Sequence, residues 1–280
     1  MLELALFSVA LTILFISAYT DIRTREVPDW VNFFGIIAGF GIRLLWGVST
    51  NDWSILGWGV LGFAAFFALA VLMYYTGQWG GGDSKLLMAM GALLGLQFTR
   101  DSIGIAFILW SLAAGAAYGL IWSLFLAISQ GKQFMLKYKT LSRSIRWAHL
   151  PVLGVFVFGV AFAVASNDQW FRVLALCIAF IAPVLFYVGL GVKAVEQCCM
   201  YKITPPARLT EGDWIAKNVT HKGKYLCGPK DLGITKKQIQ LLQKLKIKNV
   251  LVKEGIPFTP TFLIGFLLAL WLGSPLKWFI

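Results

Sequence analysis

The 280-residue chain has little charge, and acidic residues are especially scarce. Charged residues make up 14% of it, against roughly 25% in an ordinary soluble domain, and 13 Asp and Glu stand against 25 Lys and Arg. Hydrophobic residues make up 58%, and the mean hydropathy is +0.73. This balance excludes an ordinary soluble domain and predicts an all-α polytopic membrane protein.

Metal-binding residue types are also rare. The two histidines, His149 and His221, are isolated, and both fit a structural or solvated role better than a catalytic one. Cys198 and Cys199 are adjacent, which is not the spacing of zinc ligands. We therefore expect no metal and no cofactor.

Long apolar runs dominate the chain, and about 20 residues cross a bilayer as a helix. They predict a bundle of about eight transmembrane helices, six at the least, because the fourth and last runs are short. The runs cover residues 4–20, 31–48, 55–75, 83–98, 103–128, 149–165, 173–192, and 262–272 with its flanks. We expect a transmembrane core over residues 1–192 and a C-terminal transmembrane helix within residues 259–280.

Residues 193–258 differ in character, being polar and rich in Lys. Thr235 and Gln238 have the spacing of a capping box at the start of a helix. A short strand is predicted at 249–253. The stretch therefore predicts a basic cytoplasmic α/β subdomain. It could be a lipid-facing scaffold or a docking surface for a substrate or partner.

Basic residues are unevenly divided between the two predicted faces of the membrane. If the loop after the first helix is cytoplasmic, 21 Lys and Arg lie on that face and 4 on the other. The positive-inside rule then places both termini outside. The chain is expected to be a multi-pass protein of the cytoplasmic membrane. Its net charge of +12 suits anionic membrane lipids rather than nucleic acid.

Two aspartates lie where apolar runs begin or end. Asp21 follows the first run, and Asp83 follows Gly80, Gly81 and Gly82. An Asp at the centre of a membrane helix costs about 2.5–3.5 kcal/mol on insertion scales, so it suggests a functional site. The short run after Gly82 spans roughly 24 Å, less than the roughly 30 Å hydrocarbon core, which favours a water-filled recess for Asp83. The alternative is a plain turn in which Asp83 is the N-cap of a helix.

These motifs together resemble a known family. Asp21, the stretch Val27-Pro28-Asp29-Trp30 and the stretch Gly80-Gly81-Gly82-Asp83 resemble the type IV prepilin and prearchaellin (preflagellin) peptidases. These are GxGD aspartyl proteases, distantly similar to presenilin. The resemblance covers about residues 1–130. The tail, with Glu254-Gly-Ile-Pro-Phe-Thr-Pro, resembles the longer archaeal members.

The resemblance implies that Asp21 and Asp83 are catalytic. One ionised carboxylate would activate water, and the other, protonated, would donate to the scissile carbonyl. Two close like charges favour this division. Asp83 begins a helix, whose partial positive charge favours the ionised form, so we expect Asp83 to be the base. We also expect the dyad to close fully only when substrate is bound.

The resemblance further implies prepilin or prearchaellin substrates, whose short basic leader is cut before a hydrophobic helix. The Gly80, Gly81 and Gly82 backbone could pair with the extended segment around the cut. Glu26 and Asp29 could hold the basic residues of the leader, or they could be a solvated face and a helix cap. Many bacterial members of this family carry a cytoplasmic loop with paired Cys-x-x-Cys motifs and have N-methyltransferase activity. Here the loop between the first two helices has no Cys, so the resemblance implies no N-methyltransferase activity.

Two other functions stay open. A presenilin- or signal-peptide-peptidase-like intramembrane protease would carry a Tyr-Asp pair and a Pro-Ala-Leu motif, whereas Thr20 precedes Asp21 and no Pro-Ala-Leu occurs. A transporter with paired acids would place them near the midplane and show inverted repeats, which are not evident. The oligomeric state and the particular substrate are not determined by these patterns.

Overall fold

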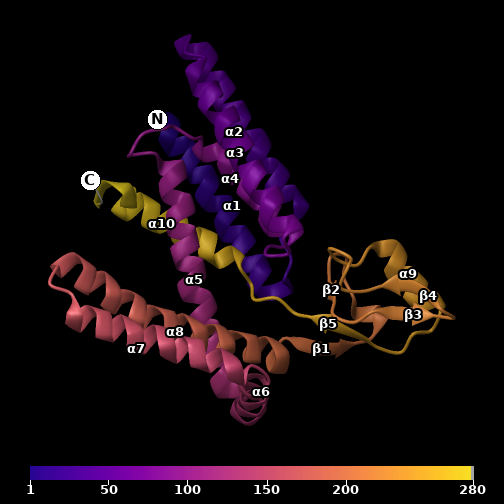
Figure 1. Ribbon diagram of the computed structural model, residues 1–280. Helices are drawn as coiled ribbons and strands as arrows, with labels where there is room; N and C mark the ends of the chain where they lie inside the picture. The colour runs from indigo at the N-terminus through magenta and orange to yellow at the C-terminus, as the bar shows by residue number, and fades with distance from the viewer. Residues whose placement is uncertain (279–280) are drawn as a thin grey trace. The chain divides into compact units, whose positions relative to one another are not determined.

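The computed structural model describes residues 1–278 and divides into two compact units. One unit comprises Met1–Gly119 with Thr204–Ile280, and the other is Leu120–Ile203. Figure 1 shows the elements of both units, coloured along the chain. Each unit is described below by itself.

The first unit contains a bundle of helices that begin and end close to the predicted positions. They are α1 (Leu2–Thr24), α2 (Asp29–Thr50), α3 (Ser54–Tyr75), α4 (Gly81–Leu94), the first part of α5 (Ile103–Ser129) and α10 (Thr259–Leu272). Within residues 1–278, six helical stretches are long and apolar enough to cross a membrane. They are α1, α2, α3, α5, residues 146–165 and α8 (Gln169–Cys199). The prediction of an all-α polytopic membrane protein is confirmed.

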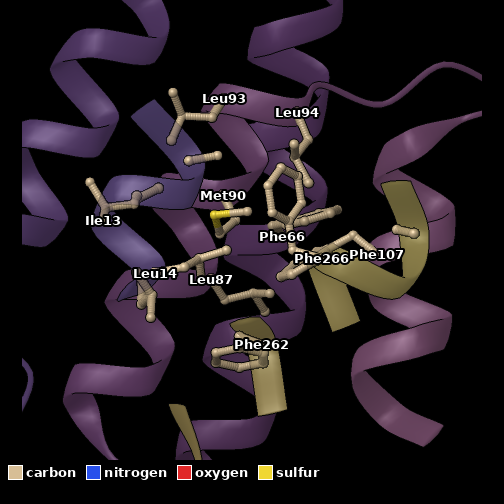
Figure 2. Packing of buried hydrophobic residues seen from close by; sticks show 14 of the residues in the cluster. Ile13, Leu14, Phe66, Leu87, Met90, Leu93, Leu94, Phe107, Phe262 and Phe266 are labelled. Carbon is tan, nitrogen blue, oxygen red and sulfur yellow. The ribbon is translucent and has the colours of Figure 1, made fainter. Parts of the chain in front are cut away.

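Helix α4 forms the centre of the bundle. It packs against α3, α2 and α1. Its residues Leu86, Leu87, Met90 and Leu93 are fully buried, and Figure 2 shows the last three among side chains of α1, α3, α5 and α10. A helix that is apolar all round is expected at such a position, since it has no face that favours water.

Two glycines let α3 and α4 approach closely. A Cβ atom built on Gly91 would lie 2.8 Å from Cβ of Phe66, and one built on Gly62 would overlap the Gly91 carbonyl oxygen. Small residues at such crossings allow backbones to touch in membrane bundles. This contact holds the last turn of α4 against α3.

Helix α4 ends at Leu94, four residues before the predicted end. Gly95 adopts a φ of 69°, in the left-handed region, which ends the helix. The buried Arg43 of α2 then donates to the carbonyl oxygens of Ala92 at 3.0 Å and Leu93 at 2.9 Å, as well as to that of Ile55. A buried arginine thus satisfies carbonyls that every helix C-terminus leaves unpaired.

The second unit contains the end of α5, α6 (Gly131–Ser144), the short turn η1 (Arg146–Ala148), α7 (His149–Ala165) and α8. Figure 1 shows α7 and α8 side by side, and they are in contact. Helix α6 lies between the apolar runs 103–128 and 149–165, in a stretch rich in Lys and Arg for which no helix was predicted. It is helical and none of its residues is buried. His149 lies within hydrogen-bond distance of Ser142 and Tyr187, which fits its predicted structural role.

Helix α8 is longer than its apolar run. It continues from 192 to Cys199, so residues 193–199 are helical rather than part of the subdomain. Lys, Glu and Gln in this extension are good helix formers, which carry the helix past the apolar stretch. Cys198 and Cys199, at its end, form a disulfide.

The polar tail forms the predicted small α/β region. Its elements are β1 (Tyr201–Thr204), η2 (Pro206–Arg208), β2 (Trp214–Ile215), β3 (Val219–His221), β4 (Lys224–Cys227), α9 (Lys236–Lys244) and β5 (Val250–Lys253). β2 pairs antiparallel with β5, and β3 with β4. Ile215, Leu242 and Val250 lie in its own small core. The capping box of Thr235 and Gln238 is confirmed at the start of α9.

Candidate active site

Asp21 lies in the last turn of α1 and is buried, with 6% of its surface exposed. Its Oδ2 accepts a hydrogen bond of 3.0 Å from the backbone amide of Thr259, the first residue of α10. The first N–H groups of a helix have no partner within the helix. Asp21 therefore occupies the N-terminal end of α10, where a negative charge is favoured.

Asp83 lies in the first turn of α4 and is half-buried. Its Oδ2 accepts a hydrogen bond of 3.3 Å from the backbone amide of Gly80, the N-cap residue. Its Oδ1 accepts one of 3.2 Å from the hydroxyl of Thr259. Asp83 thus shares in the capping of α4, although Gly80 rather than Asp83 is the N-cap.

Thr259 is the residue that joins the two aspartates, and the sequence analysis did not single it out. It is fully buried, and it donates from its backbone to Asp21 and from its side chain to Asp83. The available signal was the stretch resembling longer archaeal members, in which Thr259 precedes Pro260 at the start of an apolar run. Helices α1, α4 and α10 each supply one residue to this site.

The glycine turn allows α4 to begin close to the chain that follows α1. A Cβ atom on Gly82 would lie 3.1 Å from Cβ of Val27, tighter than most real contacts. Gly80 supplies the amide to Asp83, and Gly81 is exposed. A side chain at position 82 would press against Val27, so glycine favours this close approach, and the backbone at Gly81 stays accessible.

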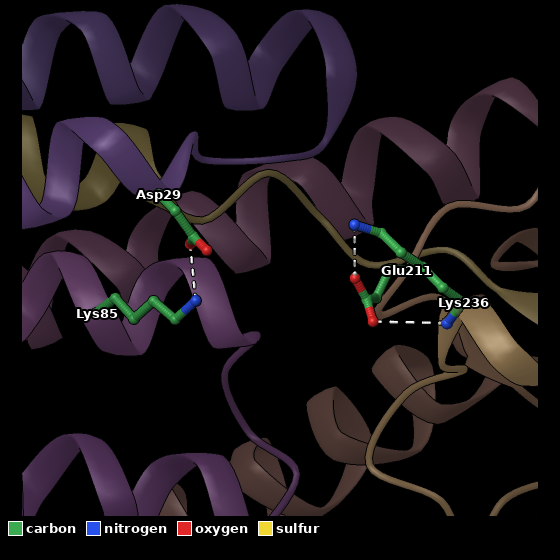
Figure 3. A network of polar contacts seen from close by, with 4 residues as sticks. All are labelled: Asp29, Lys85, Glu211 and Lys236. Atoms are coloured by element: carbon green, nitrogen blue, oxygen red, sulfur yellow. Dashed lines mark hydrogen bonds and ion pairs between the residues drawn. The ribbon is translucent and has the colours of Figure 1, made fainter.

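The other predicted substrate residues lie near the dyad but outside its hydrogen bonds. Asp29 begins α2, and its Oδ1 lies 2.7 Å from Nζ of Lys85 (Figure 3). Both side chains are largely exposed. Glu26 is exposed in the segment between α1 and α2. Arg25, next to it, donates to the carbonyl oxygen of Gly255 at 2.9 Å, which ties this segment to the chain entering α10.

An apolar pocket adjoins the dyad. It has a volume of about 360 Å³ and is lined from α3, α5 and the segments before α4 and α10. Its lining residues are Met73, Gln78, Trp79, Leu112, Gly115, Ala116 and Phe258. Trp79 precedes Gly80, and Phe258 precedes Thr259, and their rings lie 5.5 Å apart between centroids. The pocket wall is therefore continuous with the residues that bind the two carboxylates.

Several polar side chains of the bundle are buried without a hydrogen-bond partner among the described residues. Ser17, Asn32 and Ser84 have side-chain atoms that are inaccessible and make no hydrogen bond within the described residues. Ser17 lies one turn before Asp21 on α1, and Ser84 follows Asp83. Groups of this kind commonly bind ordered water. In residues 1–278, no group of three His, Cys, Asp or Glu side chains is arranged to hold a metal ion.

Such an arrangement supports general acid–base chemistry. Two carboxylates from separate helices share one hydrogen-bonding residue, and each also lies at a helix N-terminus. Carboxylates brought together in this way favour one shared proton, which supplies an acid and a base in one site. A peptide bond held between them could be hydrolysed by water.

Comparison with known proteins also indicates similarity to peptidases. Residues 8–120 match the model of the type IV leader peptidase family. Preflagellin peptidases from Methanococcus maripaludis, Methanocaldococcus jannaschii and Methanococcus voltae are 35%, 32% and 28% identical over 81, 81 and 88 residues. These matches cover 29–31% of this chain and only 34–37% of the relatives. No solved structure matches.

The matched residues contain much of the site. Asp21 and Asp83 lie inside residues 8–120, as do Glu26, Asp29 and the glycine turn. Thr259 lies outside them. Over residues 8–120, which contain Asp21 and Asp83 on two helices of one bundle, this chain is similar to the type IV leader peptidase family.

Proposed function

We propose that this protein is a membrane-embedded aspartyl endopeptidase that removes the short basic leader from prepilin- or preflagellin-like proteins. One observation carries the proposal: Asp21 and Asp83, from two different helices, both accept hydrogen bonds from Thr259. Two carboxylates in one partly buried site are costly unless they share a proton or a substrate. A structural role would need only one of them.

In the proposed reaction, one carboxyl group of the Asp21–Asp83 pair is ionised and acts as the base, and the other is protonated and acts as the acid. The base takes a proton from water, which attacks the scissile carbonyl, and the acid donates its proton to the carbonyl oxygen. The tetrahedral intermediate then breaks its C–N bond: the base passes its proton to the leaving amine, and the acid recovers a proton from a hydroxyl of the intermediate, which becomes the new carboxyl group. A backbone N–H at a helix start can stabilise the ionised form of either carboxylate, from Gly80 for Asp83 and from Thr259 for Asp21. Ser17, Asn32 and Ser84 would keep the inner side of the site polar enough for water.

The substrate would lie along the glycine turn. Its extended backbone would pair with the backbone at Gly80, Gly81 and Gly82, of which Gly81 is exposed, and such pairing needs no side chain for recognition. Glu26 and Asp29 would attract the basic residues of the leader. The apolar pocket beside Trp79 and Phe258 would receive an apolar side chain next to the cut.

The proposal includes an orientation. The excess of basic residues beside the dyad, in the stretch that contains α6 and in the tail supports a site at the cytoplasmic face of the cytoplasmic membrane. A leader on the cytoplasmic side of a nascent pilin-like protein would then reach the site directly. No methyltransferase activity is proposed.

The test is cleavage of a defined peptide by the full-length protein in membranes or detergent. The peptide carries a basic leader followed by an apolar helix, and sequencing of the new N-terminus locates the cut. Asp21→Asn and Asp83→Asn should each abolish cleavage, whereas Asp52→Asn, at the start of α3, should not. Cleavage at near-normal rate by either dyad variant would exclude the mechanism. Mass analysis of the product would also reveal any N-terminal methylation.

A further inference from the structure

We propose that Thr259 is a positioning residue, which sets the placement of the two carboxylates relative to each other. The inference rests on the proposed function and adds to it a third helix, α10, that lies outside the family match. It is carried by contacts, because Thr259 donates to both aspartates through two different groups.

The two hydrogen bonds depend on different parts of the residue. The bond to Asp21 comes from the backbone amide, so any residue except proline could supply it. The bond to Asp83 comes from the side-chain hydroxyl, so it requires Ser or Thr at this position. A substitution of the side chain therefore removes the hydroxyl and leaves the backbone bond to Asp21 in place.

The structure holds Thr259 firmly. It is fully buried at the first position of α10, and Pro260 follows it, where proline suits a helix start. Before it, Phe258 packs against Trp79, with ring centroids 5.5 Å apart, and against Phe262 at 5.4 Å. A hydroxyl on a helix end fixed in this way can hold a carboxylate in one orientation rather than follow it.

Thr259→Val tests the hydroxyl with little change in shape. The variant keeps the backbone bond to Asp21 and removes the donor to Asp83. We expect kcat to fall by about ten- to a hundredfold, as for loss of a hydrogen bond to a charged group. KM should stay within about twofold, because Thr259 does not contact the substrate in this proposal. Thr259→Ser should restore most of kcat.

Thr261→Val is the matched control. Thr261 is also fully buried on α10, and its hydroxyl donates 2.7 Å to the carbonyl oxygen of Phe258 rather than to an aspartate. Both Val variants should have similar thermal stability, and only Thr259→Val should lose kcat. An equal loss of kcat in both variants, a change confined to KM, or no loss in Thr259→Val would overturn the proposal.

A spectroscopic readout separates this inference from the proposed function. Infrared carboxyl bands assigned to Asp83 by their loss in Asp83→Asn should shift in Thr259→Val and not in Thr261→Val. If the bands shift but the wild type cleaves no leader peptide, the positioning contact stands and the proposed function fails. If the bands are unchanged, the positioning role fails whatever the activity.

Discussion

Nζ of Lys85 lies 2.7 Å from Oδ1 of Asp29, so the beginning of α4 is tied to the beginning of α2 two residues from Asp83. The carboxylate proposed to hold a basic leader therefore already has a cationic partner. Both side chains are exposed, at 41% and 60%, and such pairs contribute little to stability. In the proposed function, a lysine or arginine of the substrate could therefore displace Lys85 from Asp29.

Lys85→Gln should improve binding of a basic leader, because Asp29 loses its internal partner. We expect KM to fall by roughly two- to fivefold, the range set by an exposed ion pair, and Asp29→Asn to raise it by a similar factor. Lys236→Gln is the control, since it breaks the comparable exposed pair with Glu211 in the tail (Figure 3). Equal effects of Lys85→Gln on basic and neutral leaders would contradict this role of Asp29.

Ala116→Trp should narrow the apolar pocket beside Trp79 and Phe258. We expect kcat/KM to fall about tenfold or more for peptides with a large apolar residue next to the cut, and to change less for those with Ala there. Ala117→Trp is the control, because Ala117 is exposed on the same helix and does not line the pocket. The idea fails if both variants discriminate equally among peptides.

Arg43→Met should destabilise the bundle. It leaves the carbonyl oxygens of Ala92 and Leu93 without their donor in a buried place, which costs on the order of 3 kcal/mol in the free energy of unfolding. Arg172→Met removes a single exposed contact, to the Ser166 carbonyl, and should have little effect. Comparing the thermal midpoints of the two variants tests this, and equal midpoints would show that Arg43 is not structural.

A single Cys at Lys137 should be labelled only from the cytoplasmic side. Lys137 is exposed on α6, in the basic stretch that the positive-inside rule assigns to the cytoplasm. A Cys at Asn51, between α2 and α3, should be labelled only from outside. The measurement uses a membrane-impermeant thiol reagent on a variant without the four native cysteines. Reversed labelling would invert the proposed orientation.

Much of the fold could be predicted because its signals are local. Each apolar run became a helix, and the capping box of Thr235 began one. Helix α6 was missed because it is basic and has no buried face, so it lacks the apolar signal of the other helices. Helix α4 ends early at Gly95, and the carbonyl oxygens left unpaired there are satisfied by Arg43, which is about 50 residues away in the sequence and gives no local signal of this contact.

In the candidate site, too, the residues with a local sequence signal could be predicted and the others could not. Asp21 and Asp83 could be identified because a carboxylate at the end of an apolar run is unusual, and the glycine turn marks one of them. Thr259 could not, since a hydroxyl residue beside a proline at a helix start is ordinary in isolation. Its importance depends on two contacts across 238 and 176 residues.

The order of the chain has a consequence for biosynthesis. A growing polypeptide contains both aspartates after 83 residues, but it gains Thr259 only when most of its 280 residues have been made. A nascent enzyme still attached to the ribosome would therefore lack the residue that joins the pair. The proposed peptidase activity would then begin only after α10 has been made, which would spare neighbouring proteins at the insertion site.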